Sequence, residues 1–533
     1  MPLGPSLQSR LAAALPVGIS LQAYHVSTTP SPTNALFAPL PGEQSEATLC
    51  ESHFLGIASP QDGDHKEVLV YAVEILIFTN PSLTTLFVSK ADSSGFSSRT
   101  NAPKGSPSIV GSIISTFVQF LLEPRLAKSR VVLSLFARSQ NQYLFPGSIE
   151  NPTKHVLDDR QLIKWWCRVL DDVLRLHTDS KSPACKATAH LLVPGCDKAE
   201  TKAFFPPSSR SDSPSDPRWI NSYPVELLVA DTTKPPRHLV PRLPDDPKSR
   251  FLEDLDGDFV DEHGQWRSLK TLDQFWEMMS YRQECSAGRL VGFLWLVFSP
   301  GQSTHASLDV LEKSDKVGLS NETAIQSKSD TPGSSHSSER DLSLHGSLSA
   351  PNSGGIENDR LPRDSLSTTG SRTESAAVAD VVDSGDSKSS TISVPLTEQL
   401  AKFINIDHAT QPEGEIVINA DQYQSLTDYL LQTDFAGDHL AAESTRGWVQ
   451  KVLELSGAAA FGCPILGERT LAPSSGVQQM DAPQVNVLTG IRKKRKADNI
   501  VDSGPASSAN GPVSGQPTVN TLSAGLVRKK VKS

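Results

Sequence analysis

The distribution of aromatic residues limits where this chain of 533 residues can build a core. Aromatic residues are absent between Phe298 and Phe403 and again after Phe461. Large aromatic side chains supply much of the apolar area that a core buries, so these two stretches are expected to contribute little to a folded body. The sequence therefore predicts a core built from residues 1–300 together with residues 396–469.

The two remaining stretches differ in composition. Residues 301–395 contain 23 serines, and such a segment cannot offset the entropy cost of ordering, so we predict a disordered insert. Residues 470–533 carry two basic clusters, RKKRK at 492–496 and RKKVK at 528–532, and are predicted to form a disordered tail. The helices expected in 396–469 are too few to form a domain alone. We therefore expect them to pack on residues 1–300 as the second part of one domain.

Several classes of protein lose support from the sequence. No apolar run approaches the roughly 20 residues that span a bilayer, and Pro16 interrupts the only apolar stretch near the N-terminus, so we expect a soluble intracellular protein without a membrane partner. The chain contains no P-loop, HExxH, GxSxG or GxGxxG pattern. The six cysteines form no CxxC pair and have no histidine at ligand spacing, so no metal site is predicted: Cys50, Cys167, Cys185, Cys196, Cys285 and Cys463.

Strand and helix patterns alternate along the first 300 residues, which predicts an α/β domain with a central mixed sheet flanked by helices. The expected strands cover 66–79, 84–90, 130–136, 188–193, 225–230 and 290–298, the last of them buried on both faces. The expected helices begin at Ser106, at Asp158 with a capping box to Gln161, and at Leu272, with two more over 422–431 and 446–455.

Four clusters are candidates for chemistry. Residues 88–95 (VSKADSSG) precede Arg99, Lys104 and the predicted helix start at Ser106, and cations beside a helix N-terminus favour an anion such as a phosphate. The second cluster is 136–148, and the third is 154–166, which contains paired tryptophans. The fourth is 243–251 (LPDDPKSRF), whose prolines restrict the backbone around two aspartates and a lysine. A solvated loop, core packing and a surface turn are the ordinary alternatives for these segments.

Four strings in this order, QYLFPGS, KHVLDDRQLIKWW, LPDDPKSRF and RLVGFLWLVF, resemble the fungal-specific family of histone H3 lysine acetyltransferases. The resemblance covers about residues 1–300 and, more weakly, 400–469. That family modifies a lysine at the end of the histone αN helix, is linked to nucleosome assembly, DNA damage and genome stability, and is a distant relative of CBP-type acetyltransferases. The resemblance implies that acetyl-CoA is the co-substrate.

The resemblance also implies roles for individual residues. Asp246, with Asp245 beside it, is the acid/base candidate, Tyr143 and Trp166 line the channel for the substrate lysine, and Lys248 is the lysine that the enzyme acetylates on itself. The helix-start argument, and no shared string, places Arg99, Thr100 and Lys104 at the pyrophosphate. The implied acetyl-CoA contacts are Ala91, Asp92, Ser93, Phe136, Gln140, His155, Val156, Leu157 and Trp165.

The charge distribution fits such a role. The tail carries nine Lys or Arg against three Asp, a net charge of +6, so the rest of the chain carries −16 of the total of −10. An acidic body attracts basic histones H3–H4, and the basic tail is expected to direct nuclear import and to contact acidic histone chaperones of the NAP and anti-silencing types. No sequence-specific nucleic-acid binding is predicted. The alternatives are a non-catalytic nuclear scaffold that binds histones or chaperones, and an acyltransferase with a small-molecule acceptor.

Overall fold

The computed structural model describes residues 5–103, 105–178, 185–257, 260–282, 288–300, 396–404 and 413–470. The insert 301–395 and the tail from residue 471, predicted to be disordered, lie outside the described residues. Lys104 and Cys285 lie outside them as well. None of the described helices is long and apolar enough to cross a membrane.

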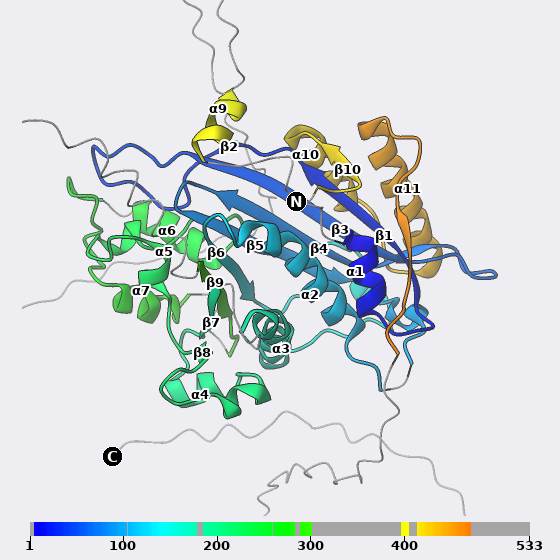
Figure 1. The fold of residues 1–533 in the computed structure, drawn as a ribbon, viewed down its shortest axis with the longest axis horizontal. Coiled ribbons are helices and arrows are strands. Elements are labelled where there is room, and N and C mark those ends of the chain that lie inside the picture. Colours follow the sequence, from blue (N-terminus) through cyan, green and yellow to red (C-terminus); the bar gives the residue numbers. More distant parts are fainter. Residues whose placement is uncertain are drawn as a thin grey trace, which may run out of the picture. The chain divides into compact units, whose positions relative to one another are not determined.

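Within the described residues the strands form one mixed sheet in the order β10-β1-β3-β4-β5-β6-β9-β7-β8, with β11 paired to β1 and β2 to β3 (Figure 1). The strands are β1 (Ser20–Thr28), β2 (Ser31–Thr33), β3 (Thr48–Ser59), β4 (Val68–Thr79), β5 (Leu83–Ser93), β6 (Arg130–Ala137), β7 (Cys185–Leu192), β8 (Trp219–Ile220), β9 (Gly292–Pro300), β10 (Ile416–Ile418) and β11 (Cys463–Leu466).

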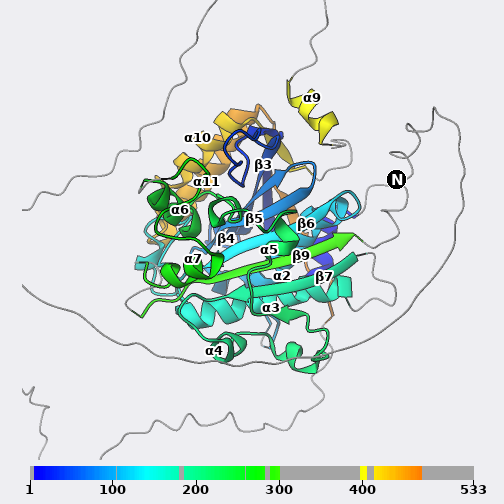
Figure 2. The ribbon, with the colours of Figure 1, turned by 90° about the vertical axis from the view of Figure 1, so that its left-hand side faces the viewer.

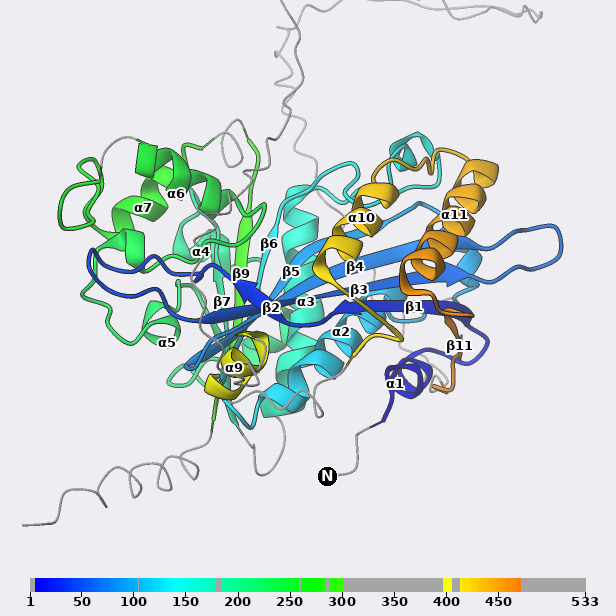
Figure 3. The same ribbon diagram turned by 90° about the horizontal axis from the view of Figure 1, so that it is seen from above.

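Helices cover both faces of this sheet. Their bounds are α1 (Leu7–Ala14), η1 (Ser97–Thr100), α2 (Ile109–Leu122), η2 (Glu123–Arg125), η3 (Ser148–Glu150), α3 (Asp159–Thr178), α4 (Lys198–Lys202), η4 (Pro207–Ser211), α5 (Val225–Leu228), η5 (Pro236–His238), α6 (Pro247–Gly257), α7 (Leu272–Met279), α9 (Leu396–Phe403), α10 (Ala420–Leu430) and α11 (Asp438–Ser456). Figure 3 shows α1 and α2 on one side of the strands and α10 and α11 on the other. The predicted α/β class is confirmed.

Strand β9 shows why the sheet needs both layers. Leu294 and Leu296 belong to the cluster that includes α3, whereas Phe293 and Trp295 belong to the cluster that includes α6 and α7. Figure 2 shows α3 running along the sheet beside β7 and β9. Side chains alternate across a strand, so an unbroken apolar run requires cover on both faces, as the sequence predicted for this segment.

The segment after the insert joins the edge of the sheet at β1. β10 pairs with β1 in parallel and β11 pairs with it antiparallel. Trp448 of α11 is 1% exposed and packs against Phe54, Tyr24 and Phe461 at ring-centroid distances of 5.3, 6.0 and 6.0 Å. Burial of this aromatic cluster attaches α11 to strands β1 and β3.

Several predicted boundaries were wrong. The helix predicted at Ser106 begins two residues later, because the Ser108 hydroxyl reaches the Gly111 amide while that of Ser106 donates to the Pro103 carbonyl. Residues 225–228 form the short helix α5 after Pro224, and no strand. Strands β1 and β3 and helix α6 were not predicted.

Asp254 and Asp256 lie in the last part of α6. The Asp256 carboxylate accepts hydrogen bonds from Arg237, Arg242 and the Trp266 indole, so it is a structural anchor for α6. The capping box at Asp158 is confirmed, since its Oδ1 accepts from the Gln161 amide at 2.8 Å.

Two buried histidines lie under α2. Nε2 of His25 in β1 is 3.1 Å from Nδ1 of His53 in β3, and the His25 ring meets Phe117 of α2 edge-on. Burial lowers the pKa of both imidazoles. His53 lowers the pKa of His25 further, whereas Glu51 partly opposes the shift at His53. Both rings are therefore neutral in the folded protein at pH 7.

This pair predicts a loss of stability in mild acid. Below pH of about 6.5 the unfolded chain binds protons that the buried rings do not, which costs up to about 1.4 kcal/mol per histidine per pH unit. We expect a lower Tm at pH 5.5 than at pH 7.5 by scanning calorimetry, and a shallower dependence in His25→Gln. An equal pH dependence in parent and variant would contradict this assignment.

Candidate active site

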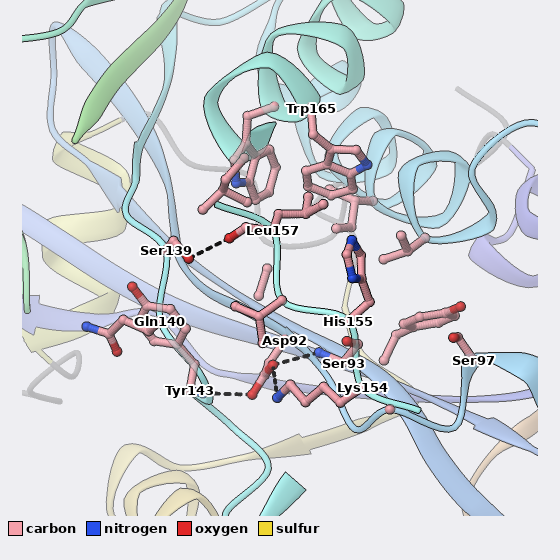
Figure 4. Close-up of a pocket in the computed structure, with 18 of the residues that line it drawn as sticks. Asp92, Ser93, Ser97, Ser139, Gln140, Tyr143, Lys154, His155, Leu157 and Trp165 are labelled. Carbon is pink, nitrogen blue, oxygen red and sulfur yellow. Dashed lines mark hydrogen bonds and ion pairs between the residues drawn. The ribbon is translucent and has the colours of Figure 1, made fainter. Parts of the chain in front are cut away.

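A cavity of about 280 Å³ opens where three segments meet: the end of β5, the loop after β6 and the segment before α3 (Figure 4). Its polar and apolar walls come from residues far apart in the chain. The lining residues are Tyr71, Ala91, Asp92, Ser93, Gly95, Ser97, Val110, Ile114, Arg138, Ser139, Gln140, Tyr143, Lys154, His155, Val156, Leu157, Leu162, Trp165 and Trp166.

The Asp92 carboxylate joins the end of β5 to the loop at residues 143–145 and to Lys154. Its Oδ2 accepts the backbone amides of Tyr143, Leu144 and Phe145 at 2.7, 2.9 and 3.3 Å. Its Oδ1 accepts the amide of Ser93 at 2.8 Å and Nζ of Lys154 at 3.0 Å (Figure 4). Both carboxylate oxygens are thus engaged within the protein, and Asp92 holds three segments in register.

Lys154 completes this anchor from the opposite segment. Its side chain is 3% exposed and also donates to the Ser148 hydroxyl at 2.7 Å. A buried ion pair is useful only where hydrogen bonds satisfy both partners, and both are satisfied here. Because His155, Val156 and Leu157 follow directly, the pair also determines where that cavity wall begins.

The aromatic side chains of Tyr143, Trp165 and Trp166 also line the cavity. The Tyr143 hydroxyl donates to the Arg138 carbonyl at 3.0 Å, and burial raises the pKa of this phenol to about 12, so it keeps its proton at neutral pH. Trp165 and Trp166 meet edge to face with centroids 4.9 Å apart at the start of α3. Trp166 is buried and also belongs to the core cluster, so the tryptophans both pack the core and line the cavity.

Ten of the residues named from the sequence lie in this one cavity. They are Ala91, Asp92, Ser93, Gln140, Tyr143, His155, Val156, Leu157, Trp165 and Trp166. Phe136, Arg99, Thr100, Asp245, Asp246 and Lys248 do not line it. The Phe136 ring instead packs against a core cluster that contains Phe87, with the two ring centroids 6.2 Å apart.

The structure does not bring Arg99 into the cavity. Its guanidinium pairs with Asp438 at the start of α11 and donates to the Lys66 carbonyl at 3.1 Å. Thr100 is buried, and its hydroxyl donates to the Ser97 carbonyl at 2.8 Å. The sequence argument placed the helix start at Ser106, whereas α2 is capped by Ser108. From this segment Ser97 lines the cavity.

The two aspartates of the acidic turn have opposite environments. Asp245 adopts a positive φ of 56°, is 68% exposed and lies 3.6 Å from Lys90. Asp246 is fully buried and pairs with the equally buried Lys248, whose Nζ lies 4.3 Å from the centre of the Phe293 ring. Burial lowers the pKa of Lys248, although Asp246 opposes this shift.

Other lining residues were not singled out from the sequence. Arg138 and Ser139 lie within the second cluster but carried no individual signal, and Lys154 begins the third. Tyr71 lies in the middle of β4, and Val110 and Ile114 belong to the apolar face of α2, so their patterns indicated only core packing. Across the part of the chain that the structure describes, no group of His, Cys, Asp or Glu could hold a metal ion.

Comparison with known proteins identifies the family. The sequence model of the histone acetyltransferase KAT11-type domain matches residues 7–130 and 126–451. The histone acetyltransferase rtt109 of Aspergillus flavus is 39% identical over 98% of each chain, and that of Schizosaccharomyces pombe is 30% identical over 52% of this chain and 68% of its own.

A solved structure agrees with these sequence matches. The crystal structure of Rtt109 from Aspergillus fumigatus has a TM-score of 0.64 and 37% identity, covering 88% of this chain and all of that one. These matches confirm the resemblance carried by the four strings. The chain therefore belongs to the KAT11-type histone acetyltransferase family, in its fungal Rtt109 branch.

Proposed function

We propose that this histone acetyltransferase transfers the acetyl group of acetyl-CoA to a lysine of histone H3, and that the transfer takes place at the cavity beside Asp92. The observation that carries the proposal is that residues 91–93, 138–140, Tyr143 and 155–157 line one cavity together with the double tryptophan. We further propose that the enzyme acts in the nucleus on H3–H4 presented by a histone chaperone, in support of nucleosome assembly and genome stability.

The cavity fits acetyl-CoA, which combines a slender, largely apolar arm with anionic phosphates. Val110, Ile114, Leu162 and Trp165 supply apolar wall, and Arg138 supplies a cation at the lining. Acetyl-CoA brings the thioester whose acyl group is transferred. The placement of Arg99 and Thr100 at the pyrophosphate remains a proposal that requires Arg99 to leave Asp438.

The chain's own residues favour a neutral amine. A free lysine has a pKa of about 10.4, and only its unprotonated form attacks a thioester. The walls formed by Tyr143 and Trp166 favour that form by desolvation. Since Tyr143 keeps its proton, it acts as a hydrogen-bond donor, and the proton of the amine passes to another group.

Asp246 is the proposed acceptor of that proton, and because it does not line the cavity, the proposal requires a route for the proton from the cavity to its buried carboxylate. In the structure its carboxylate accepts from the backbone amide of Lys248 at 2.9 Å and pairs with the Lys248 ammonium. Acetylation of Lys248 by the enzyme itself would remove that positive charge and release one carboxylate oxygen. The lowered pKa of Lys248 favours the neutral amine that such a reaction requires.

Direct transfer between the bound substrates is the proposed route. Among the described residues no cysteine lines the cavity. Cys167, in α3 below Trp166, is buried, and burial raises the pKa of its thiol well above the ordinary value. A buried thiol of this kind is a poor nucleophile, which argues against an acyl-cysteine step.

Asp246→Asn is expected to lower kcat on H3–H4 by about 100-fold or more, the usual range for loss of a general base, with little change in acetyl-CoA affinity. Asp245→Asn, in the exposed neighbour, is the matched control and should stay within about threefold of the parent. Labelled acetyl transfer in the presence of a chaperone measures both. A larger loss in Asp245→Asn would reverse the assignment.

Lys248 is expected to carry an acetyl group after incubation with acetyl-CoA, detectable by peptide mass spectrometry. Lys248→Arg keeps a charge beside Asp246 and should lower kcat, while the neutral Lys248→Gln should retain more activity than Lys248→Arg. Equal turnover and equal acetyl-CoA affinity in Lys248→Arg and the parent would remove the regulatory role.

Asp92→Asn should weaken acetyl-CoA binding by about tenfold or more, because it removes the charge that holds Lys154 and three backbone amides. Asp171→Asn is the control, since Asp171 is also buried and binds Arg175, Trp219 and Ser208 away from this cavity. Calorimetric titration of both variants tests the difference. Equal affinity in the two variants would refute a special role for Asp92.

A further inference from the structure

The first residue of α3, Asp159, directs its carboxylate to two other segments of the chain. Oδ1 accepts the Ser139 amide at 3.1 Å, and Oδ2 accepts the Leu290 amide at 3.1 Å and Nε of Arg289 at 2.8 Å. The side chain is 12% exposed, whereas that of Arg289 is 51% exposed. Asp159 therefore joins the start of α3 to the loop after β6 and to the residues before β9.

Ser139 is held at every polar group it has. Its amide donates to Asp159, its carbonyl accepts from Nη2 of Arg289, and its hydroxyl donates to the Leu157 carbonyl at 2.6 Å. Arg289 Nη2 also reaches Oδ1 of Asp159 at 3.1 Å. Because Ser139 and Leu157 both line the cavity, the hydrogen bond from the Ser139 hydroxyl to the Leu157 carbonyl connects two of its walls (Figure 4).

The position of this cluster explains why it matters to the site. Arg138, Ser139 and Gln140 line the cavity and also a second, more polar hollow that includes Asp159 and Arg289. The exposed residues 140–142 thus lie between two anchors, Ser139 on one side and the amides bound by Asp92 on the other. Loss of either anchor would free one end of this wall.

Helix capping does not account for Asp159. Asp158 already performs that task, since its carboxylate and backbone amide exchange hydrogen bonds with Gln161. Burial opposes ionisation of Asp159, but bonds from Arg289, Leu290 and Ser139 outweigh it and hold the pKa of this carboxyl below its ordinary value. The carboxylate is therefore charged throughout the neutral range.

We propose that Asp159 is a positioning residue for acetyl-CoA binding: together with Arg289 it holds Ser139 so that the wall at 138–140 and the wall at 155–157 keep their spacing. This inference rests on the proposed function of the cavity. Asp159 and Arg289 thus affect the affinity for acetyl-CoA through their contacts with Ser139.

The test compares Asp159→Asn and Arg289→Ala with Asp212→Asn in the full chain. Asp212 is a close match, because it accepts from Nε and Nη2 of one arginine, Arg218, and from a backbone amide, and it lies outside the cavity. We expect the Kd and KM for acetyl-CoA to rise about tenfold in Asp159→Asn and in Arg289→Ala, and to stay near the parent value in Asp212→Asn. The KM for histone should change little.

Coupling and hydrogen exchange provide independent readouts. The double variant should bind acetyl-CoA no more weakly than Asp159→Asn alone, because both changes release the same wall. The Ser139 and Leu290 amides should exchange faster in Asp159→Asn, a measurement that needs no cofactor.

Two results would overturn the inference: a Kd within twofold of the parent in Asp159→Asn, or the same rise in Asp212→Asn. If the parent chain itself fails to bind acetyl-CoA, the proposed function of the cavity falls and this inference falls with it. Faster amide exchange would then identify Asp159 as a structural contact alone.

Discussion

The carboxylate of Asp92 is the contact on which the geometry of the cavity depends. It lies at the end of β5, beyond the part of the strand that pairs with β6, where no strand neighbour satisfies the loop amides of residues 143–145. One charged group accepts all three and also neutralises Lys154. Charge-assisted bonds are about twice as strong as neutral ones, so a single side chain can hold a loop that has no secondary structure of its own.

Two further anchors act on the same walls from different directions. Asp159 and Arg289 hold Ser139, and the Ser139 hydroxyl holds Leu157. The segment 138–157 is therefore attached to β5, to α3 and to the residues before β9, and helices cover both faces of the sheet that contains β5 and β9. A cavity of this kind is preformed, and preformed sites bind with less loss of conformational entropy.

The acidic turn illustrates how neighbouring residues acquire different chemistry. Asp245 takes a left-handed backbone conformation and faces solvent beside Lys90, whereas Asp246 turns inward and pairs with Lys248 under Phe293. A buried pair is destabilised strongly when only one partner loses its charge. Acetylation at Lys248 would therefore change the electrostatics around Asp246 far more than a change at the exposed Asp245.

Much of this architecture could be predicted from local pattern. Apolar runs and caps predicted β4, β5, β6, β9 and α3, and the four shared strings contain or adjoin most of the cavity. Strands β1 and β3 were missed because their signals, such as the histidines and serines within them, do not alternate clearly with apolar residues. Helix α6 was missed because Pro247, its first residue, follows Pro244 and the paired Asp245 and Asp246, a run that also fits a turn.

By itself the sequence determined the α/β class, the family and the segments from which the cavity is built, since these depend on periodicity and short strings. Only the tertiary structure decided what each charged side chain does. Arg99 meets Asp438, Asp92 meets Lys154, and Asp159 meets Arg289, in each case across a long separation in the chain. Burial and charge pairing depend on neighbours in space, and spacing along the sequence does not contain that information.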